Sequence, residues 1–349
     1  MFLIREVEAR DLEDLYRLAS MAGFINLPRD KSLLTKKITK SVNSFRGKIP
    51  NVRDSEYMFV LEDRERGRVI GTSMMIAQHG TPDEPHTFFQ VVTKKKISKS
   101  LHIGFLHQVL RIGFDFDGPT EIGALVLDPE YRNRPEKLGK ILSFSRFMYM
   151  AARRPLFRDE VLCELMPPFN ERGDSPIWEE VGRRFTNLSY DEADRLSRKN
   201  KEFITSLFPE GDIYTCMLSS EARQAVGEVN PDTQPVKRML EKIGFHYRNM
   251  IDPFDGGPHY LAKTGSIDPV KRTKRVRWNP GKKSKEAKNL DGLLLTFSKK
   301  GARMGAARIS LSAGGDFTAD ADLIETLGIE SGTECHFLEM KNDSAGKSS

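Results

Sequence analysis

Apolar residues recur along the chain with two periods, and each period predicts a type of element. Residues 2–7 alternate in the manner of a strand, and leucines at helical spacing follow Asp11, which predicts a strand that leads into a helix. Asp30 is placed to cap a second helix, while residues 57–61 and 69–77 predict two strands joined by a charged turn. The pattern therefore begins with a strand, two helices and a hairpin.

A continuous apolar run lies beyond this hairpin, after an irregular region without clear periodicity. Residues 121–127 (EIGALVL) suit a central strand that is buried on both faces, and Asp128 with Pro129 ends it. Apolar residues at helical spacing over 138–153 and a short run at 161–165 predict a helix and another strand. This order of elements predicts an α+β fold built on a mixed sheet.

The second half of the chain predicts shorter elements and a different C-terminal region. Helices are expected at about 177–181, 190–196, 219–226, 233–243 and 321–327, and strands at 245–250, 260–262, 292–297, 307–311 and 333–338. From these elements we expect four segments: a core over 1–265 with halves at about 1–150 and 151–265, a basic linker over 266–290, a small β-rich unit over 291–340, and a disordered tail over 341–349.

The charge pattern argues against nucleic acid as a partner. The chain has 55 basic and 49 acidic residues, and the two signs are interleaved over most of its length. Residues 271–288 are the exception, which we interpret as a solvated linker; the alternative is an electrostatic patch in which Trp278 stacks on a base. The opening residues resemble neither a signal peptide nor a membrane span, so a cytoplasmic location is expected.

The segment that follows the central strand carries an anion-binding pattern. Residues 125–143 (LVLDPEYRNRPEKLGKILS) combine a strand, an Asp-Pro corner and a basic loop that opens a helix. A helix N-terminus binds anions such as a pyrophosphate through its N–H groups and its dipole. The segment resembles the coenzyme A motif of GCN5-related acyltransferases, with lysine in place of the first glycine; the alternative is a helix start with basic flanks. The resemblance implies that coenzyme A binds at Leu125, Leu127, Arg134, Lys137, Gly139 and Lys140.

A second resemblance extends over most of the chain and is most specific at residues 227–258 (GEVNPDTQPVKRMLEKIGFHYRNMIDPFDGGP). Other segments match in order and spacing, among them YMFVLED, ALVLDPEYR, LSFSRFMYMAA, SPIWEEVGRRF and FITSLFPEGDIY. Together they resemble the bacterial arginine N-succinyltransferases. The resemblance implies a mixed-sheet acyl-CoA N-acyltransferase (GNAT-like) fold with two similar halves.

The same resemblance implies a reaction and its co-substrates. Enzymes of this family move a succinyl group from succinyl-CoA to the α-amino nitrogen of L-arginine, with ornithine as a second acceptor in some members. This step opens the degradation of arginine to glutamate. No metal is implied, and the histidines show no HExxH or comparable ligand spacing. Homo-oligomers and hetero-oligomers both remain open, and no membrane partner is implied.

Asn230 departs from the family pattern, at the position of the histidine that is presumed to transfer the proton. An asparagine cannot take a proton at neutral pH, whereas attack of an amine on a thioester needs a base. Glu164 is the first candidate for that base, and Glu121 and His246 are further candidates, each with a purely structural alternative. Three functions stay open: the family reaction, an N-acyltransferase with a different donor or acceptor, and a non-catalytic or weakly active interaction subunit.

The candidate residues for substrate binding are charged. Relatives carry an arginine where this chain has Met166, and Arg248 is a candidate to replace that charge. Asp252 and Asp255 in IDPFDGGP are candidate partners for the guanidinium of an acceptor, and the alternative is that they only form a turn. Two further arginines are alternatives to Arg248, namely Arg183 and Arg184.

Overall fold

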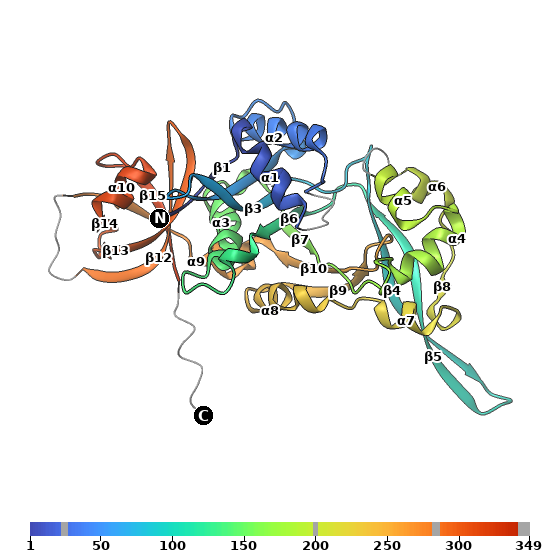
Figure 1. Ribbon diagram of the computed structural model, residues 1–349. Coiled ribbons are helices and arrows are strands. Elements are labelled where there is room, and N and C mark those ends of the chain that lie inside the picture. Colours follow the sequence, from blue (N-terminus) through green and yellow to red (C-terminus); the bar gives the residue numbers. More distant parts are fainter. Residues whose placement is uncertain (22–26, 198–201, 281–286, 341–349) are drawn as a thin grey trace. The chain divides into compact units, whose positions relative to one another are not determined.

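The computed structural model describes residues 1–21, 27–197, 202–280 and 287–340 (Figure 1). The tail predicted to be disordered, 341–349, lies outside the described residues. The chain forms two compact units that alternate along the sequence, unlike the predicted halves at 1–150 and 151–265, because the chain leaves the first unit and later re-enters it. Unit 1 contains Met1–Ala77, Ile122–Arg158 and Thr264–Ser349, and unit 2 contains Gln78–Glu121 and Asp159–Lys263.

The first elements of unit 1 agree with the apolar pattern. They are β1 (Phe2–Glu6), α1 (Leu12–Ala19), α2 (Lys31–Phe45), β2 (Glu56–Asp63), β3 (Arg68–Ile76), β6 (Thr120–Leu127), whose first two residues belong to unit 2, and α3 (Leu138–Ala152). The side chain of Asp30 accepts a hydrogen bond from the N–H of Leu33 at 2.9 Å, so the predicted cap of α2 is confirmed. Leu15, Leu34 and Met58 are fully buried in one core, which explains the helical and strand periods.

The C-terminal part of unit 1 is a closed ring of five strands, seen at the orange and red end of the chain in Figure 1. Each strand pairs with two others in the order β12-β15-β11-β14-β13 and back to β12, and β13 also pairs with β1. The elements of this region are α9 (Asp268–Arg272), β11 (Lys274–Trp278), β12 (Lys288–Ser298), β13 (Gly301–Leu311), β14 (Asp316–Ala319), α10 (Ala321–Leu327) and β15 (Glu334–Glu339).

The described part of the predicted linker over 266–290 is therefore structured, and the β-rich region begins at Lys274. Val276 and Trp278 alternate with exposed basic residues along β11 and are buried in the ring. This alternation is present in KRVRW but is obscured by the basic composition around it. Trp278 packs on Phe317, with ring centroids 5.4 Å apart, so the alternative that it stacks on a nucleic-acid base is wrong.

Unit 2 contains a sheet with the strand order β7-β10-β9-β4-β5-β8, and β7 also pairs in parallel with the start of β6. Phe89, Trp178 and Phe254 are buried in its core. Its strands are β4 (His86–Ser98), β5 (Ile103–Asp115), β7 (Glu160–Glu164), β8 (Ile213–Tyr214), β9 (His246–Ile251) and β10 (Pro258–Lys263), and its helices are α4 (Arg183–Thr186), α5 (Tyr190–Ser197), α6 (Glu202–Leu207), α7 (Ser220–Ala225) and α8 (Gln234–Lys242). Across both units, none of the described helices has the length and apolar character needed to cross a membrane.

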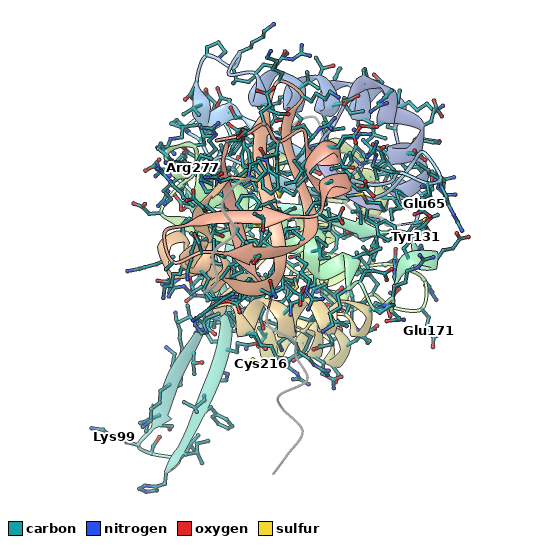
Figure 2. The ribbon with its side chains drawn as sticks, turned by 90° about the vertical axis from the view of Figure 1, so that its left-hand side faces the viewer. Glu65, Lys99, Tyr131, Glu171, Cys216 and Arg277 are labelled. Carbon is teal, nitrogen blue, oxygen red and sulfur yellow. The ribbon has the colours of Figure 1, made fainter. Side chains whose placement is uncertain are left out.

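The expectation of an irregular region before the central strand is wrong, because this region forms the long hairpin of β4 and β5. The two strands pair over their full lengths, and Figure 2 shows Lys99 at the far end of the hairpin. Apolar side chains near that end are exposed. The apolar positions along these strands therefore do not mark a buried face. The exposed residues are Ile97, Leu101, Ile103, Phe105 and Leu106.

Candidate active site

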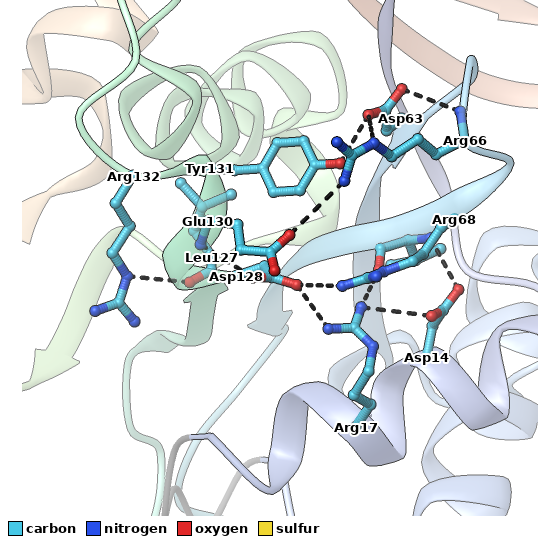
Figure 3. Close-up of polar contacts among 11 residues, drawn as sticks. Asp14, Arg17, Asp63, Arg66, Arg68, Leu127, Asp128, Glu130, Tyr131 and Arg132 are labelled. Carbon is cyan, nitrogen blue, oxygen red and sulfur yellow. Dashed lines mark hydrogen bonds and ion pairs between the residues drawn. The ribbon is translucent and has the colours of Figure 1, made fainter.

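The turn after β6 is held by a buried carboxylate, Asp128 (Figure 3). Arg17 and Arg68 donate to its Oδ2 at 2.7 and 2.6 Å, and the N–H of Glu130 donates to its Oδ1 at 3.1 Å. Burial by itself raises the pKa of Asp128, but these donors outweigh it and hold the pKa below the ordinary value of 3.8. The N–H of Asp128 also donates to the carbonyl of Ile70 at 2.8 Å, so the end of the strand is fixed.

The loop between this turn and α3 holds one of the predicted cations. The hydroxyl of Tyr131 donates to Asp63 at 2.8 Å, and the guanidinium of Arg134 lies over the Tyr131 ring, 4.3 Å from its centroid. Nε of Arg132 donates to the carbonyl of Leu127 at 3.2 Å. Arg134 is thus positioned by a buried aromatic side chain before any ligand binds.

Helix α3 begins at the residues that the coenzyme A resemblance singles out. Lys137 is the N-cap, with φ of +52°, and Gly139 and Lys140 lie in the first turn. The N–H groups of a first turn have no carbonyl four residues earlier within the helix, and they carry the positive end of the dipole. A Cβ added at Gly139 comes no closer than 3.8 Å to its nearest neighbour, Leu127. Packing within the protein therefore does not require a glycine here. A glycine would be required if a ligand approached the protein backbone closely at this position.

Lys137 has a left-handed backbone where the acyltransferase motif has glycine, and that conformation costs a non-glycine residue about 1 kcal/mol. We expect Lys137→Gly to stabilise the protein by about that amount. Lys140→Gly, inside the helix, is the matched control and should destabilise the protein by about 1 kcal/mol. Urea denaturation measures both changes. A loss of stability in Lys137→Gly would mean that the lysine side chain contributes more than its backbone costs.

Leu125 and Leu127 lie on β6 and are half-buried, while Val126 between them is buried. The strand is locally distorted just before them, because Ala124 has a left-handed backbone with φ of +48°. The distortion directly precedes Leu125 and Leu127, two of the residues at which the resemblance implies that coenzyme A binds.

Unit 2 brings three histidines and three carboxylates together. His259 stands opposite Glu164 in the β7–β10 pair, with Nε2 3.4 Å from Oε1 of Glu164. His86, at the start of β4, places its Nε2 3.7 Å from the same oxygen, and Nδ1 of His79 lies 2.9 Å from Oε2 of Glu121. The set is named the Glu164 cluster and comprises His79, His86, Glu121, Glu164, Asp252 and His259.

The Glu164 cluster combines fully buried side chains with partly exposed ones. His86 and His259 are 2% and 0% exposed, whereas the side chains of Glu164 and His79 are 29% and 20% exposed. Gly118 lets the His79 loop pass closely, since an added Cβ would lie 2.0 Å from the carbonyl oxygen of His79. Sequence reasoning singles out the glutamates and misses the histidines, because these come from separate segments and share no local spacing.

Asn230 is part of the turn after α7. Its Oδ1 accepts a hydrogen bond from the N–H of Asp232 at 2.9 Å and caps a short helical turn, Pro231–Thr233. Its own N–H donates to the carbonyl of Met166 at 2.8 Å, two residues beyond Glu164. The position therefore lies beside the segment that carries Glu164, while its side-chain oxygen caps a turn.

Arg248 lies at the other end of β7 from the Glu164 cluster. It pairs with Glu160 at 3.2 Å, and both side chains are exposed. Glu160 and Glu164 are four residues apart on one strand, which separates them by about 13 Å. Other candidates named from the sequence are exposed on unit 2, namely Arg183, Arg184 and His246.

The two aspartates of IDPFDGGP form a turn, as the structural alternative expects. Asp252 Oδ1 accepts hydrogen bonds from the N–H groups of Phe254 and Asp255 at 2.6 and 3.3 Å. Asp255 Oδ1 accepts one from the N–H of Gly257 at 2.7 Å. Binding of a guanidinium by these aspartates stays a prediction.

Burial raises the pKa of Asp255 well above the ordinary value of 3.8, and the charge of Asp252 adds to the shift. An acid whose pKa is higher in the folded state destabilises the fold as the pH rises from its unfolded pKa to its folded pKa. Asp255→Asn keeps an oxygen for the N–H of Gly257 and removes this titration. We expect the variant to gain stability over the wild type as the pH rises from about 4 toward the raised folded-state pKa of Asp255. Urea denaturation across this range tests it, and a difference that does not change with pH would contradict it.

The turn after β6, the distorted strand and the basic start of α3 are the features expected of an acyl-CoA N-acyltransferase. Residues 2–269 match the profile of a family described as arginine N-succinyltransferase beta subunit. This chain belongs to the arginine N-succinyltransferase family.

Individual relatives agree with this assignment. The arginine N-succinyltransferase of Citrobacter koseri is 41% identical over 280 residues, which is 79% of each chain, and that of Escherichia coli O6:K15:H31 is 38% identical over 279 residues, 79% of this chain and 80% of the relative. The solved structure of arginine/ornithine succinyltransferase subunit AI from Pseudomonas aeruginosa matches with a TM-score of 0.84 at 28% identity, over 98% of this chain and 99% of the other. The predicted acyltransferase fold class is confirmed.

Proposed function

We propose that this protein transfers the succinyl group of succinyl-CoA to the α-amino group of L-arginine, with ornithine as a second acceptor. The proposal is carried by the 41% identity, over 79% of the chain, to an enzyme named for this reaction. The name of the relative from Pseudomonas aeruginosa includes ornithine and supports the second acceptor. The product would enter the degradation of arginine to glutamate.

The reaction forms an amide and breaks a thioester. The α-amino nitrogen attacks the thioester carbonyl carbon, the carbon–sulfur bond breaks, and coenzyme A leaves and takes up a proton as its thiol. An α-ammonium group must lose a proton to a base before or during this attack. The carbonyl oxygen becomes negative in the tetrahedral intermediate and needs a hydrogen-bond donor. We assign the NH₂ group of Asn230 to that oxygen or to orienting the amine.

We assign coenzyme A binding to the start of α3 and the strand before it. Arg134, Lys137 and Lys140 supply positive charge near the first turn of α3. Gly139 lets the pyrophosphate approach the protein backbone closely. The distorted β6 at Leu125 and Leu127 supports pairing with the amides of the pantetheine arm. The choice of a succinyl donor is supported by the names of the relatives.

We assign proton acceptance to Glu164, acting directly or through a water within the Glu164 cluster. Its partial exposure supports access for an amine, and Asn230 has no basic atom for this task. Binding of the acceptor by Arg248, Asp252 and Asp255 stays a prediction. The same holds for oligomeric state and cytoplasmic location.

Release of the coenzyme A thiol from succinyl-CoA, followed with a thiol reagent, tests the proposal against arginine, ornithine, lysine and agmatine. We expect the highest kcat/KM with arginine. No turnover with any acceptor, together with tight binding of coenzyme A, would favour the interaction subunit instead, which is the function that Asn230 keeps open. Asn230→His then tests whether residue 230 lies near the reacting groups. A large gain in rate would show that it does, and an unchanged rate would show that it does not.

A further inference from the structure

The Glu164 cluster contains two sets of ligand atoms with the spacing of a metal site. One set is His79, His86 and Glu164, and the other is Glu164, Asp252 and His259. Within each set, the ligand atoms lie within 4.8 Å of one another. Two imidazole nitrogens, one from each set, lie 3.7 and 3.4 Å from the same oxygen of Glu164.

Both distances are longer than a direct hydrogen bond and close to the separation of two ligands on one metal ion. A good N–H···O bond spans about 2.7–3.2 Å, which is shorter than either distance. Two ligands of a tetrahedral zinc ion, with bonds of about 2.0–2.2 Å, lie about 3.3–3.6 Å apart. The His259 nitrogen, at 3.4 Å, lies within this range, and the His86 nitrogen, at 3.7 Å, lies just beyond it.

We propose that this protein binds a divalent transition-metal ion of the zinc class through His79, His86 and Glu164. Glu121 supports this set, because its contact with Nδ1 of His79 leaves Nε2 as the ligand atom. Metal-ligating imidazoles are commonly oriented by a carboxylate in this way. The other set is less suitable, because Oδ1 of Asp252 already accepts two backbone N–H groups.

The ligand types select the class of ion. Imidazole and carboxylate together suit zinc, iron or cobalt, whereas magnesium and calcium prefer oxygen ligands throughout. Three protein ligands leave a fourth position for water, and the partial exposure of Glu164 and His79 gives that position access to solvent. The sequence implies no metal because the ligands come from a loop, the start of β4 and the end of β7. An ion bound there would engage the Glu164 carboxylate, so proton acceptance from the amine would pass to the water in the fourth position.

Metal binding by the full chain tests the proposal without any use of succinyl-CoA. Protein stripped with a chelator is titrated with zinc chloride in a calorimeter, and with Co²⁺ while the visible absorption is recorded. We expect about one zinc ion per chain and the spectrum of tetrahedral Co²⁺.

Variants locate the ion. His79→Ala should abolish zinc binding, and Glu121→Gln should weaken it by about 10–100-fold. His107→Gln, on β5, is the matched control and should bind zinc as the wild type does. Absence of binding to the wild type overturns the proposal, and so does binding that survives His79→Ala, which would mark uptake elsewhere on the surface. Because the titrations need no acyl donor, a protein that binds zinc without transferring succinyl groups would refute only the proposed function.

Discussion

Glu164→Gln is expected to lower kcat for succinyl transfer to arginine by about 10²–10⁴-fold. The amide has nearly the shape of the carboxylate but cannot accept the proton that the amine must lose. KM for succinyl-CoA should stay within about twofold, since the residues assigned to coenzyme A are on β6, on α3 or in the loop between them rather than on β7. Steady-state kinetics with the thiol-release assay measure both constants.

Glu171→Gln is the matched control, because Glu171 is an exposed glutamate in the same unit and has no assigned role. It should leave kcat unchanged. The acid limb of the pH profile of kcat/KM should also be lost in Glu164→Gln, which a purely structural role would not cause. A variant that keeps more than half of the wild-type kcat, with an unchanged pH profile, would remove Glu164 from the chemistry.

Elements that bury one clear stripe could be predicted from the sequence. The helices α1 and α2 and the strands β2 and β3 share one core, so their apolar periods report their geometry directly. Asp30 has a single role, and its cap is visible from the sequence alone. The central strand β6 is equally clear from its apolar run, whereas the distortion at Ala124 depends on contacts that local sequence does not encode.

Elements whose burial is not set by their own sequence could not be predicted. The distal part of β4 and β5 exposes apolar residues and carries a run of lysines, so neither strand shows the alternation of a half-buried sheet. Strand β11 does alternate, but it is short and basic, and its strand pairing is with β14 and β15, which are distant in sequence. Both cases depend on tertiary pairing.

The candidate site likewise contains residues that could be predicted from the sequence and residues that could not. Lys137, Gly139 and Lys140 are close in sequence, so a motif can identify them together. The Glu164 cluster depends instead on the register that sets His259 opposite Glu164, and on the loop that carries His79. A shift of one residue in that register would turn His259 to the other face of the sheet. No single-sequence pattern fixes such a register across segments this far apart.

Asp128→Asn is expected to destabilise the protein by about 2–3 kcal/mol, the largest stability change predicted for a single polar side chain here. The amide of the variant keeps an oxygen for the N–H of Glu130. It lacks the negative charge of the carboxylate, to which the guanidinium groups of Arg17 and Arg68 both donate. Asp128 itself is only 2% exposed, so water cannot replace the carboxylate. Arg17 and Arg68 are partly exposed, which keeps the expected loss below that of a fully buried ion pair. Urea denaturation at neutral pH measures the difference.

The pH dependence gives this prediction its sharper test. The folded state holds the pKa of Asp128 below 3.8, so the carboxylate stabilises the fold above about pH 4, and this contribution is lost as the pH falls through the lower folded pKa. The gap between wild type and Asp128→Asn should therefore be full at neutral pH and should shrink in acid. Glu130→Gln is the control: its carboxylate is exposed and 3.7 Å from Arg66, so it should change stability by less than about 0.5 kcal/mol. A gap that stays constant into acid would show that Asp128 acts through its shape and not through its charge.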